Sequence, residues 1–338
     1  MSSEKITLEH GGGGTKMMKL IAETVLKEFS LKRAGLVGLD DLDDGATVDI
    51  GNHHLVFTTD AHTVKPIFFP GGDIGKLSVC GTVNDLAVMG ARPLVMSSAV
   101  VVEEGFLVED FRKICSSMAT VCSEIGLPLI TGDFKVMEKG ALDRIVITTT
   151  GLGLAKEVKT DSMLRPGQKI ILTGTVGDHG ATLLAFRHGF DIGKELASDV
   201  APLWETIEAA MQAGEVSAMK DPTRGGVAGA LNEMASKSNV GIVVWEEAIP
   251  ISEAVSALCE TLGVDPYYIV NEGKALIGVS ANDGNNILDA IHHTKYGKNA
   301  QIIGEVTKDY PGKVILETKN AGRRILQPPE GDPYPRIC

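Results

Sequence analysis

The sequence predicts a mixed α+β and α/β protein built from two domains. Its 338 residues exceed the usual length of one domain, and segments typical of strands and helices alternate along both halves. A turn-rich stretch, Leu164-Arg165-Pro166-Gly167-Gln168, separates the halves, and its proline and glycine are typical of a loop. We therefore place the domain boundary between Ala155 and Arg165.

The first half carries clear start and stop signals for one central helix. Asp73 is a good N-cap before an apolar run, and Gly90 follows that run where a helix would end. Gly126 closes a second, amphipathic helix in the same way. The first half is predicted to contain helices at 16–29, 74–89 and 109–125 and strands at 54–60, 94–102 and 144–151.

The second half continues the alternation of short apolar runs and longer periodic segments. It is predicted to contain strands at 169–173, 242–245, 275–281 and 301–306 and helices at 179–188, 200–213, 227–236, 252–262 and 285–296. The alternation in both halves therefore favours a fold in which helices cover the faces of sheets.

The composition excludes several classes of function. A hydrophobic content of 43% and a charged content of 22% are ordinary for a globular protein. The net charge of −12 argues against binding nucleic acid through a basic face, although an anion such as ATP could bind through a divalent metal. No apolar run approaches the roughly 18 residues of a membrane span, and the start of the chain lacks a signal-peptide core.

The cysteines predict a reducing cytoplasm. There are five of them, an odd number, and no two form a C-x-x-C pair. Cys80 and Cys115 lie within apolar helical patterns, where a cysteine is usually a small buried hydrophobic residue. The histidines form no H-E-x-x-H pattern, so we expect no structural zinc site.

Aspartates stand at several places that suit a divalent metal. Asp40-Asp41-Leu42-Asp43-Asp44 is either a solvated acidic loop or part of a magnesium site, since Mg2+ prefers carboxylate oxygens. Asp60 ends a predicted strand. Asn84 and Asp85 interrupt the apolar run from Val79 to Met89, and a buried carboxylate is costly unless it is paired or binds metal. Asp85 is therefore the better ligand candidate.

Three further polar stretches have two interpretations each. Gly11-Gly12-Gly13-Gly14 precedes a helix and is either a phosphate-binding loop or a flexible linker. Asp221-Pro222-Thr223-Arg224-Gly225-Gly226 suits phosphate and metal binding but could be an ordinary helix start. Asp133, Lys135 and Glu138 lie on one short predicted connection, which could equally be a polar hairpin loop.

The end of the sequence is rich in proline. Proline lacks a backbone N–H, so this segment should be extended, at about 3.1 Å per residue. The last residue, Cys338, is either an incidental cysteine on a frayed tail or a nucleophile on a mobile arm. The four prolines of this segment are Pro328, Pro329, Pro333 and Pro335.

Taken together, these stretches resemble the HypE family of hydrogenase-maturation proteins, within the PurM-like ATP-binding superfamily. The resemblance covers nearly the whole chain, and its motifs occur in the family's order. They are His10–Gly14, Thr59-Asp60, Phe69–Lys76, Thr82–Ala87, Met89–Pro93, Thr131–Asp133, Gly174–Gly180, Asp221–Gly226, Asn271–Lys274 and Pro335–Cys338.

The departures from the family pattern are small. Asp43-Asp44-Gly45-Ala46 stands where Asp-Asp-Ala-Ala is common, and Phe134 stands where threonine is frequent. Gly14 follows Gly13 where the family alternates a small residue and glycine. The first departure leaves open whether Asp43 or Asp44 binds metal, and we favour Asp44.

The resemblance implies a PurM-like architecture. An N-terminal α+β domain would pair its sheet with that of a second subunit to form a dimeric barrel, and a C-terminal α/β domain would follow. The implied segments are a glycine-rich and acidic segment at 1–44, the ATP-binding domain at 45–155, the second domain at 165–327 and a flexible tail at 328–338.

The resemblance also implies that ATP and Mg2+ bind in the cleft between the two domains. The implied metal ligands are Asp44, Asp60, Asp85 and Asp221. The implied ATP-binding residues are Gly11, Gly12, Gly13, Gly14, Asp60, Asn84, Asp133, Thr223 and Arg224. Cys338 would carry the reacting group, and Lys135 and Glu138 are candidates for proton transfer or for guiding the tail.

The implied reaction is ATP-dependent dehydration of a carbamoyl group on Cys338 to S-cyanocysteine, which supplies cyanide to the iron of [NiFe] hydrogenase. The implied partners are a second copy of the chain, a HypF-like carbamoyltransferase and a HypC–HypD-like iron scaffold. Two alternatives remain at this point. One is a PurM-like synthetase acting on a free metabolite, and the other is a non-catalytic assembly scaffold.

Overall fold

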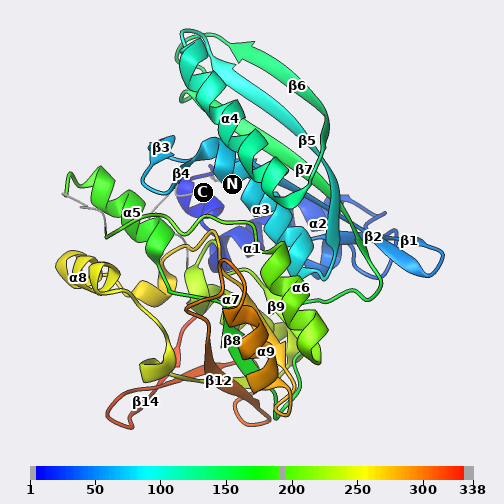
Figure 1. Ribbon diagram of the computed structural model, residues 1–338, viewed down its shortest axis with the longest axis vertical. Helices are drawn as coiled ribbons and strands as arrows, with labels where there is room; N and C mark the ends of the chain where they lie inside the picture. Colours follow the sequence, from blue (N-terminus) through cyan, green and yellow to red (C-terminus); the bar gives the residue numbers. More distant parts are fainter. Residues whose placement is uncertain (1–4, 191–194, 331–338) are drawn as a thin grey trace.

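Two β-sheets and the helices around them form the molecule in a computed structural model, which describes residues 5–190 and 195–330. The first sheet has five strands and lies at the top of Figure 1, and the second has seven and lies at the bottom. A two-stranded ribbon joins β3 (Phe68–Phe69) to β4 (Gly72–Asp73). The prediction of a two-domain fold that mixes helices and strands is confirmed.

The five-stranded sheet has helices on one face only. Its order is β1-β2-β7-β5-β6, and all its pairs are antiparallel except β5 with β6. Along β7, alternate residues from Ile145 to Ala155 are buried and those between them are more exposed. Its elements are β1 (Ala46–Ile50), β2 (His53–His62), α3 (Ile74–Val88), β5 (Arg92–Glu103), α4 (Val108–Ile125), β6 (Leu129–Met137) and β7 (Ile145–Ala155).

Helix α3 lies between the two domains. Its N-cap Asp73 accepts a hydrogen bond from the backbone N–H of Lys76 at 2.9 Å, as the sequence predicted. Of its 15 residues 13 are buried, because the first sheet lies on one side and α6 of the second domain on another. A helix that is apolar all round must be buried in this way, and this placement carries Asp85 into the interior.

The N-terminal segment differs from its prediction. The helix expected at 16–29 is two helices, which meet at Thr24. The Thr24 hydroxyl donates to the Leu20 carbonyl at 2.5 Å, and such bonding back to the preceding turn bends helices. The elements of this segment are η1 (Leu8–Gly11), α1 (Gly14–Glu23), α2 (Val25–Glu28) and η2 (Leu39–Asp41).

The seven-stranded sheet has the order β14-β13-β10-β12-β8-β11-β9, and only β10 and β13 pair in parallel. The sequence analysis did not predict β1, β9, β13 or β14. Its strands are β8 (Lys169–Leu172), β9 (Val216–Lys220), β10 (Gly241–Trp245), β11 (Leu276–Val279), β12 (Gln301–Thr307), β13 (Val314–Glu317) and β14 (Arg323–Leu326).

Helices surround this second sheet. They are α5 (Asp178–Arg187), α6 (Trp204–Ala213), η3 (Glu246–Ala248), α7 (Gly226–Ser238), α8 (Glu253–Leu262), η4 (Pro266–Tyr268) and α9 (Gly284–His292). The helix predicted at 200–213 begins only at Trp204. Within the described residues, no helix is both long enough and apolar enough to cross a membrane.

Strand β6 corrects one prediction about the site. Asp133 and Lys135 were expected on a connection, but they lie inside β6, and Glu138 follows its end. Parallel pairing with β5 turns this polar stretch into an edge strand. All nine of its residues are exposed, including Ile130, Phe134 and Val136. Cys115, expected to be buried, is also exposed.

Candidate functional site

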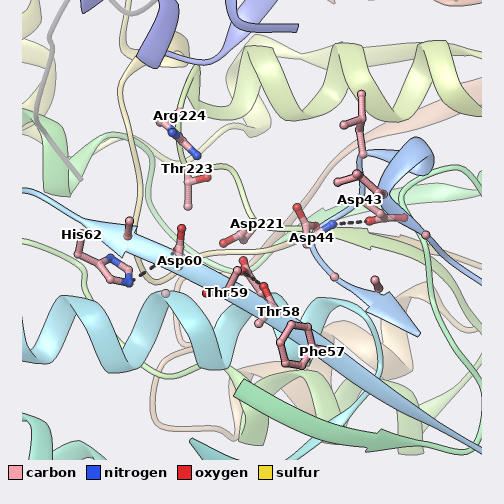
Figure 2. Close-up of a pocket in the computed structure, with 18 of the residues that line it drawn as sticks. Asp43, Asp44, Phe57, Thr58, Thr59, Asp60, His62, Asp221, Thr223 and Arg224 are labelled. Carbon is pink, nitrogen blue, oxygen red and sulfur yellow. Dashed lines mark hydrogen bonds and ion pairs between the residues drawn. The ribbon is translucent and has the colours of Figure 1, made fainter. Parts of the chain in front are cut away.

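A cavity of about 500 Å³ lies where the two domains meet. Strand β2 forms one wall, and the loop before β1 and the segment after β9 form others. Figure 2 shows Asp44, Asp60 and Asp221 around the same space, with Thr223 and Arg224 nearby. Residues from both domains line this cavity, so the fold itself creates it.

Three carboxylates converge at the base of the cavity. One oxygen from each of Asp44, Asp85 and Asp221 lies within 4.8 Å of the others. Asp44 comes from the loop before β1, Asp85 from α3 and Asp221 from the end of β9. We call these residues the carboxylate trio. Of the two candidates in the acidic loop, the structure brings Asp44 rather than Asp43 into the trio.

The trio brings three acidic groups together in a largely buried place. Burial raises the pKa of Asp85 well above its usual value, and nearby carboxylates add to the effect. Burial, followed by the charge of Asp44, raises the pKa of Asp221 to about 8. The Oδ2 atom of Asp44 is buried and has no hydrogen-bond partner among the described residues. These oxygen ligands fit Mg2+, which would neutralise them.

The start of α7 faces the same cavity. Thr223 and Arg224 line it, and Gly225 and Gly226 follow with φ angles of 82° and 61°, a conformation that favours glycine. A side chain at position 226 would also meet the Tyr267 carbonyl oxygen at 2.6 Å. Backbone N–H groups at such a helix start suit a phosphate.

The glycine loop lies at the rim of the cavity. The Arg224 guanidinium donates to the Gly11 carbonyl at 3.4 Å, and a Cβ on Gly13 would lie 3.2 Å from the Arg224 Cβ. Residues 11–14 are therefore next to the cavity, but in the described structure they are not part of its lining. Loop closure over a ligand would need a further movement.

Asp60 lines the cavity from β2 without belonging to the trio. Its Oδ2 atom lies 3.7 Å from Nε2 of the buried His62, whose pKa is lowered by burial. Thr58, two residues before Asp60, donates its hydroxyl to Oδ2 of Asp85 at 2.7 Å. Strand β2 thus contributes both a lining carboxylate and a group that orients a trio member.

Glu272 is a site residue that was not singled out from the sequence. It lines the cavity, is only 4% exposed, and its Oε1 atom has no hydrogen-bond partner among the described residues. Burial, followed by the charge of Asp221, raises its pKa well above the usual value. The only signal in the sequence was the short polar cluster Asn271–Lys274.

A buried ion pair holds Glu272 in place. Asp199 accepts a hydrogen bond from the Glu272 backbone N–H at 3.2 Å and pairs with Lys274 Nζ at 3.0 Å. Asn271 accepts from the Gly177 N–H at 2.7 Å and donates to the Pro222 carbonyl at 3.0 Å. The segment that carries Glu272 is therefore fixed on both sides.

Asn84 of α3 makes hydrogen bonds to residues of the second domain. It was expected to bind ATP, but it is 1% exposed and does not belong to the described lining of the cavity. Its amide donates to the carbonyls of Ala201 and Glu272, and its oxygen accepts from the Leu203 N–H at 2.9 Å. Its hydrogen-bonding capacity is used in holding the domains together.

The residues on or after β6 lie away from this cavity. In the sheet, β7 and β5 stand between β2 and β6. Lys135 Nζ pairs with Asp133 at 2.7 Å on the exposed surface, and neither residue, nor Glu138, belongs to the cavity's described lining. A single chain therefore does not bring Asp133, Lys135 and Glu138 to the carboxylate trio.

The root of the C-terminal tail lies beside the glycine loop. The backbone N–H groups of Thr15 and Lys16 donate to the carbonyls of Pro329 and Glu330, each at 3.4 Å. The Pro329 ring also packs near Gly225, where an added Cβ would lie 2.9 Å from Cγ of the proline. Cys338, predicted as the reactive residue, lies outside the described residues.

Comparison with known proteins first gives the class. The N-terminal domain of AIR synthase related proteins matches residues 42–155, and their C-terminal domain matches residues 165–317. The chain is thus a two-domain AIR synthase related protein.

Closer relatives give the family. A Methanocaldococcus jannaschii protein named for hydrogenase expression/formation is 48% identical over 99% of this chain and 100% of its own length. Carbamoyl dehydratase HypE of Azotobacter vinelandii is 40% identical over 98% of this chain and 97% of its own. The chain belongs to the HypE family.

Two solved HypE structures superpose closely on the whole fold. HypE in a HypE–HypF complex is 40% identical, with a TM-score of 0.85 over 92% of this chain and 99% of that chain. HypE in complex with ATP is 36% identical, with a TM-score of 0.82 over 99% of this chain and 100% of that chain. The family resemblance predicted from the sequence is confirmed.

Proposed function

We propose that this chain is an ATP-dependent carbamoyl dehydratase that converts S-carbamoyl-Cys338 into S-cyanocysteine for [NiFe] hydrogenase maturation. The observation that carries the proposal is the carboxylate trio with Glu272 in one interdomain cavity beside the root of the tail. A HypE relative that matches over 97% of its own length carries the name carbamoyl dehydratase.

Asp44, Asp85 and Asp221 would hold Mg2+, with Asp60 close by, and the start of α7 would bind the phosphates of ATP through Thr223 and Arg224. Bound there, Mg2+ supplies positive charge to the phosphate oxygens. The glycine loop at 11–14 would then close over the nucleotide from the rim, since it already contacts Arg224.

The tail is long enough to reach the cavity. Eight residues follow Glu330, which at about 3.1 Å each span roughly 25 Å. Their root lies next to Gly225, the neighbour of the lining residue Arg224. Cys338 could therefore present its carboxamide to the γ-phosphate, and holding the two groups together supplies much of the catalysis.

The chemistry removes one oxygen and two protons from the carboxamide. Its oxygen attacks the γ-phosphorus, ADP leaves, and the carbon now carries a phosphate group. Loss of both nitrogen-bound protons and departure of that phosphate then form the C≡N bond. Glu272 is the group that would accept a proton, because its buried oxygen lacks a partner among the described residues and its raised pKa suits a base.

The protein would act as a homodimer. Strand β6 is exposed along its length, and the face of the sheet opposite α3 and α4 is uncovered, which includes Phe57 and Leu154. Long apolar edge strands seldom stay unpaired in stable proteins. A second copy paired there would form the barrel and could bring Asp133, Lys135 and Glu138 to its partner's cavity.

Two further partners follow from the chemistry. Carbamoylation of Cys338 needs a donor, for which a HypF-like carbamoyltransferase is the candidate, since a HypE relative has been solved in a HypE–HypF complex. The cyanide needs an acceptor, for which we propose a HypC–HypD-like complex that holds iron. A synthetase acting on a free metabolite would not need Cys338, and a scaffold would not consume ATP.

The test is intact mass spectrometry of the purified full chain after incubation with a carbamoyl donor, its transferase, ATP and Mg2+. We expect a gain of one carbamoyl group and then a loss of one water. Cys338→Ala should show neither change while still binding ATP. Loss of water in Cys338→Ala, or a carbamoylated chain that never loses water, would contradict the proposal.

A further inference from the structure

Lys220, the last residue of β9, lies buried behind the carboxylate trio. Its ammonium donates to Oδ1 of Asp44 at 2.8 Å and lies 3.3 Å from Glu233 and 3.4 Å from Asp161. These partners come from the loop before β1, from α7 and from the segment between the domains. A buried ammonium is stable only when it is paired in this way.

The contact with Lys220 leaves one oxygen of Asp44 for a metal. Oδ1 is engaged by the ammonium, whereas Oδ2 is buried and has no hydrogen-bond partner among the described residues. Asp85 is restricted similarly, because Thr58 donates to its Oδ2 atom at 2.7 Å. In these two members of the trio one oxygen already accepts a hydrogen bond, so the other oxygen is the more available for a metal.

The number of oxygens offered per carboxylate matters for the choice of metal. Ca2+ takes 6–8 oxygen ligands and often binds both oxygens of one carboxylate, whereas the smaller Mg2+ demands octahedral geometry and keeps several waters. A site in which two of the three carboxylates present mainly one oxygen suits Mg2+ better than Ca2+, which more often binds both oxygens of a carboxylate.

We propose that Lys220 determines the metal specificity of this site by holding Asp44 in a one-oxygen geometry that favours Mg2+ over Ca2+. The inference rests on the metal site of the proposed function. Lys220 acts through Asp44 and is a positioning residue. Thr58 occupies one oxygen of Asp85 with a neutral hydroxyl. The preference for Mg2+ would therefore depend on the occupied carboxylate oxygen and not on the positive charge of Lys220 alone.

Lys237 offers a matched control. Its ammonium donates to Asp161 at 2.7 Å and to the Leu42 carbonyl at 2.6 Å, so it belongs to the same network. No contact between Lys237 and Asp44 is present within the described part of the chain. Lys237→Met therefore removes a positive charge of the network and leaves the oxygens of Asp44 as they are.

The experiment measures thermal unfolding of the full chain with a non-hydrolysable ATP analogue while Mg2+ or Ca2+ is titrated. The ratio of the two apparent affinities reports the preference without any need for turnover. We expect wild type to prefer Mg2+, and Lys220→Met to lose about tenfold or more of that preference by binding Ca2+ better. Lys220→Arg and Lys237→Met should keep it.

Thr58→Val tests the same idea without burying an unpaired charge, so it remains informative if Lys220→Met does not fold. It should relax the preference in the same direction. An unchanged ratio in Thr58→Val or Lys220→Met, or an equal loss in Lys237→Met, would overturn the inference while dehydration by wild type still stands. A wild type that shows no response to either metal would overturn the metal site as well.

Discussion

Two regions of the molecule carry predicted site residues, and they differ in burial. The carboxylate trio lies in the interior, where Asp85 is held by α3 and oriented by Thr58. Strand β6 carries Asp133 and Lys135 on an edge where every residue is exposed, and these two side chains form an ion pair.

This difference in burial indicates which site residues one chain can bring together without a second copy. In the trio, burial raises the pKa of each carboxyl, and a bound cation would offset the charge of these groups. On β6 the charges are solvated and the apolar side chains are uncovered. The carboxylate trio would therefore function within one chain, whereas the residues of β6 would need a second copy of the chain.

The largest effect should come from the buried region. Asp85→Asn removes a charged ligand of the trio, so dehydration of carbamoylated protein should fall at least about 100-fold. The metal-free variant should unfold at a higher temperature, because a buried carboxylate is replaced by a neutral amide. Asp289→Asn, on the exposed surface of α9, is the control and should change neither property. Full activity in Asp85→Asn would remove this residue from the metal site.

Glu272→Gln should have the next largest effect. Loss of the proton acceptor should lower kcat by about 10²–10⁴-fold and leave the KM for ATP nearly unchanged. The base must be deprotonated, and burial raises the pKa of Glu272, so wild-type kcat should fall as the pH drops through a value well above 4.5. The pH profile of the variant should lack this limb. If kcat of the variant still fell at low pH, the pH dependence would belong to a group other than Glu272.

A mixing experiment tests the exposed region directly. Suppose that Lys135 of each chain acts in the cavity of its partner. In a mixed dimer of one Asp85→Asn chain and one Lys135→Ala chain, the cavity of the Lys135→Ala chain then has both Asp85 and the partner's Lys135, so one of the two sites is intact. A mixture of the two inactive proteins, after subunit exchange, should then recover about a quarter of wild-type activity. Mass spectrometry of the cyanated chain measures it. No recovery would place Lys135 either in its own chain's site or outside the reaction.

The smallest effect concerns the cysteines. Burial raises the pKa of Cys259 to about 11 and also raises that of Cys80, whereas Cys115 is exposed. The thiolate is the reactive form, so alkylation of native protein at pH 8 should modify Cys115 well before Cys80 or Cys259. The rate at Cys259 should rise about tenfold per pH unit below its pKa. Peptide mapping measures this, and equal rates at Cys115 and Cys259 would contradict it.

Much of the buried region could be predicted because its signals are local. Asp73 and Gly90 mark the ends of α3 through hydrogen bonds within a few residues, and a carboxylate inside an apolar run indicates a special role. Glu272 was missed because it lies in a short irregular segment without periodicity. The contacts of Asn84 could not be predicted either, because Asp85 lines the cavity while its neighbour Asn84 contacts Ala201 and Leu203 of the other domain.

The structure of the exposed strand β6 could not be predicted from local signals. Whether the stretch at 129–137 forms a loop or a strand depends on whether β5 is free to pair with it, and that pairing is parallel and joined through α4. The unpredicted strands β9 and β13 pose the same problem, since β9 pairs with β11 and β13 pairs with β10, which are distant in the chain.

By itself the sequence determined the helix caps, the buried carboxylate of α3 and the order of motifs that places the chain in its family. Only the tertiary structure decided that Asp44, Asp85 and Asp221 meet, that Lys220 lies behind them, and that β6 remains uncovered. Caps and periodicity depend on residues a few positions apart. The meeting of the three carboxylates depends on sheet order and domain packing, which are set by contacts between distant parts of the chain.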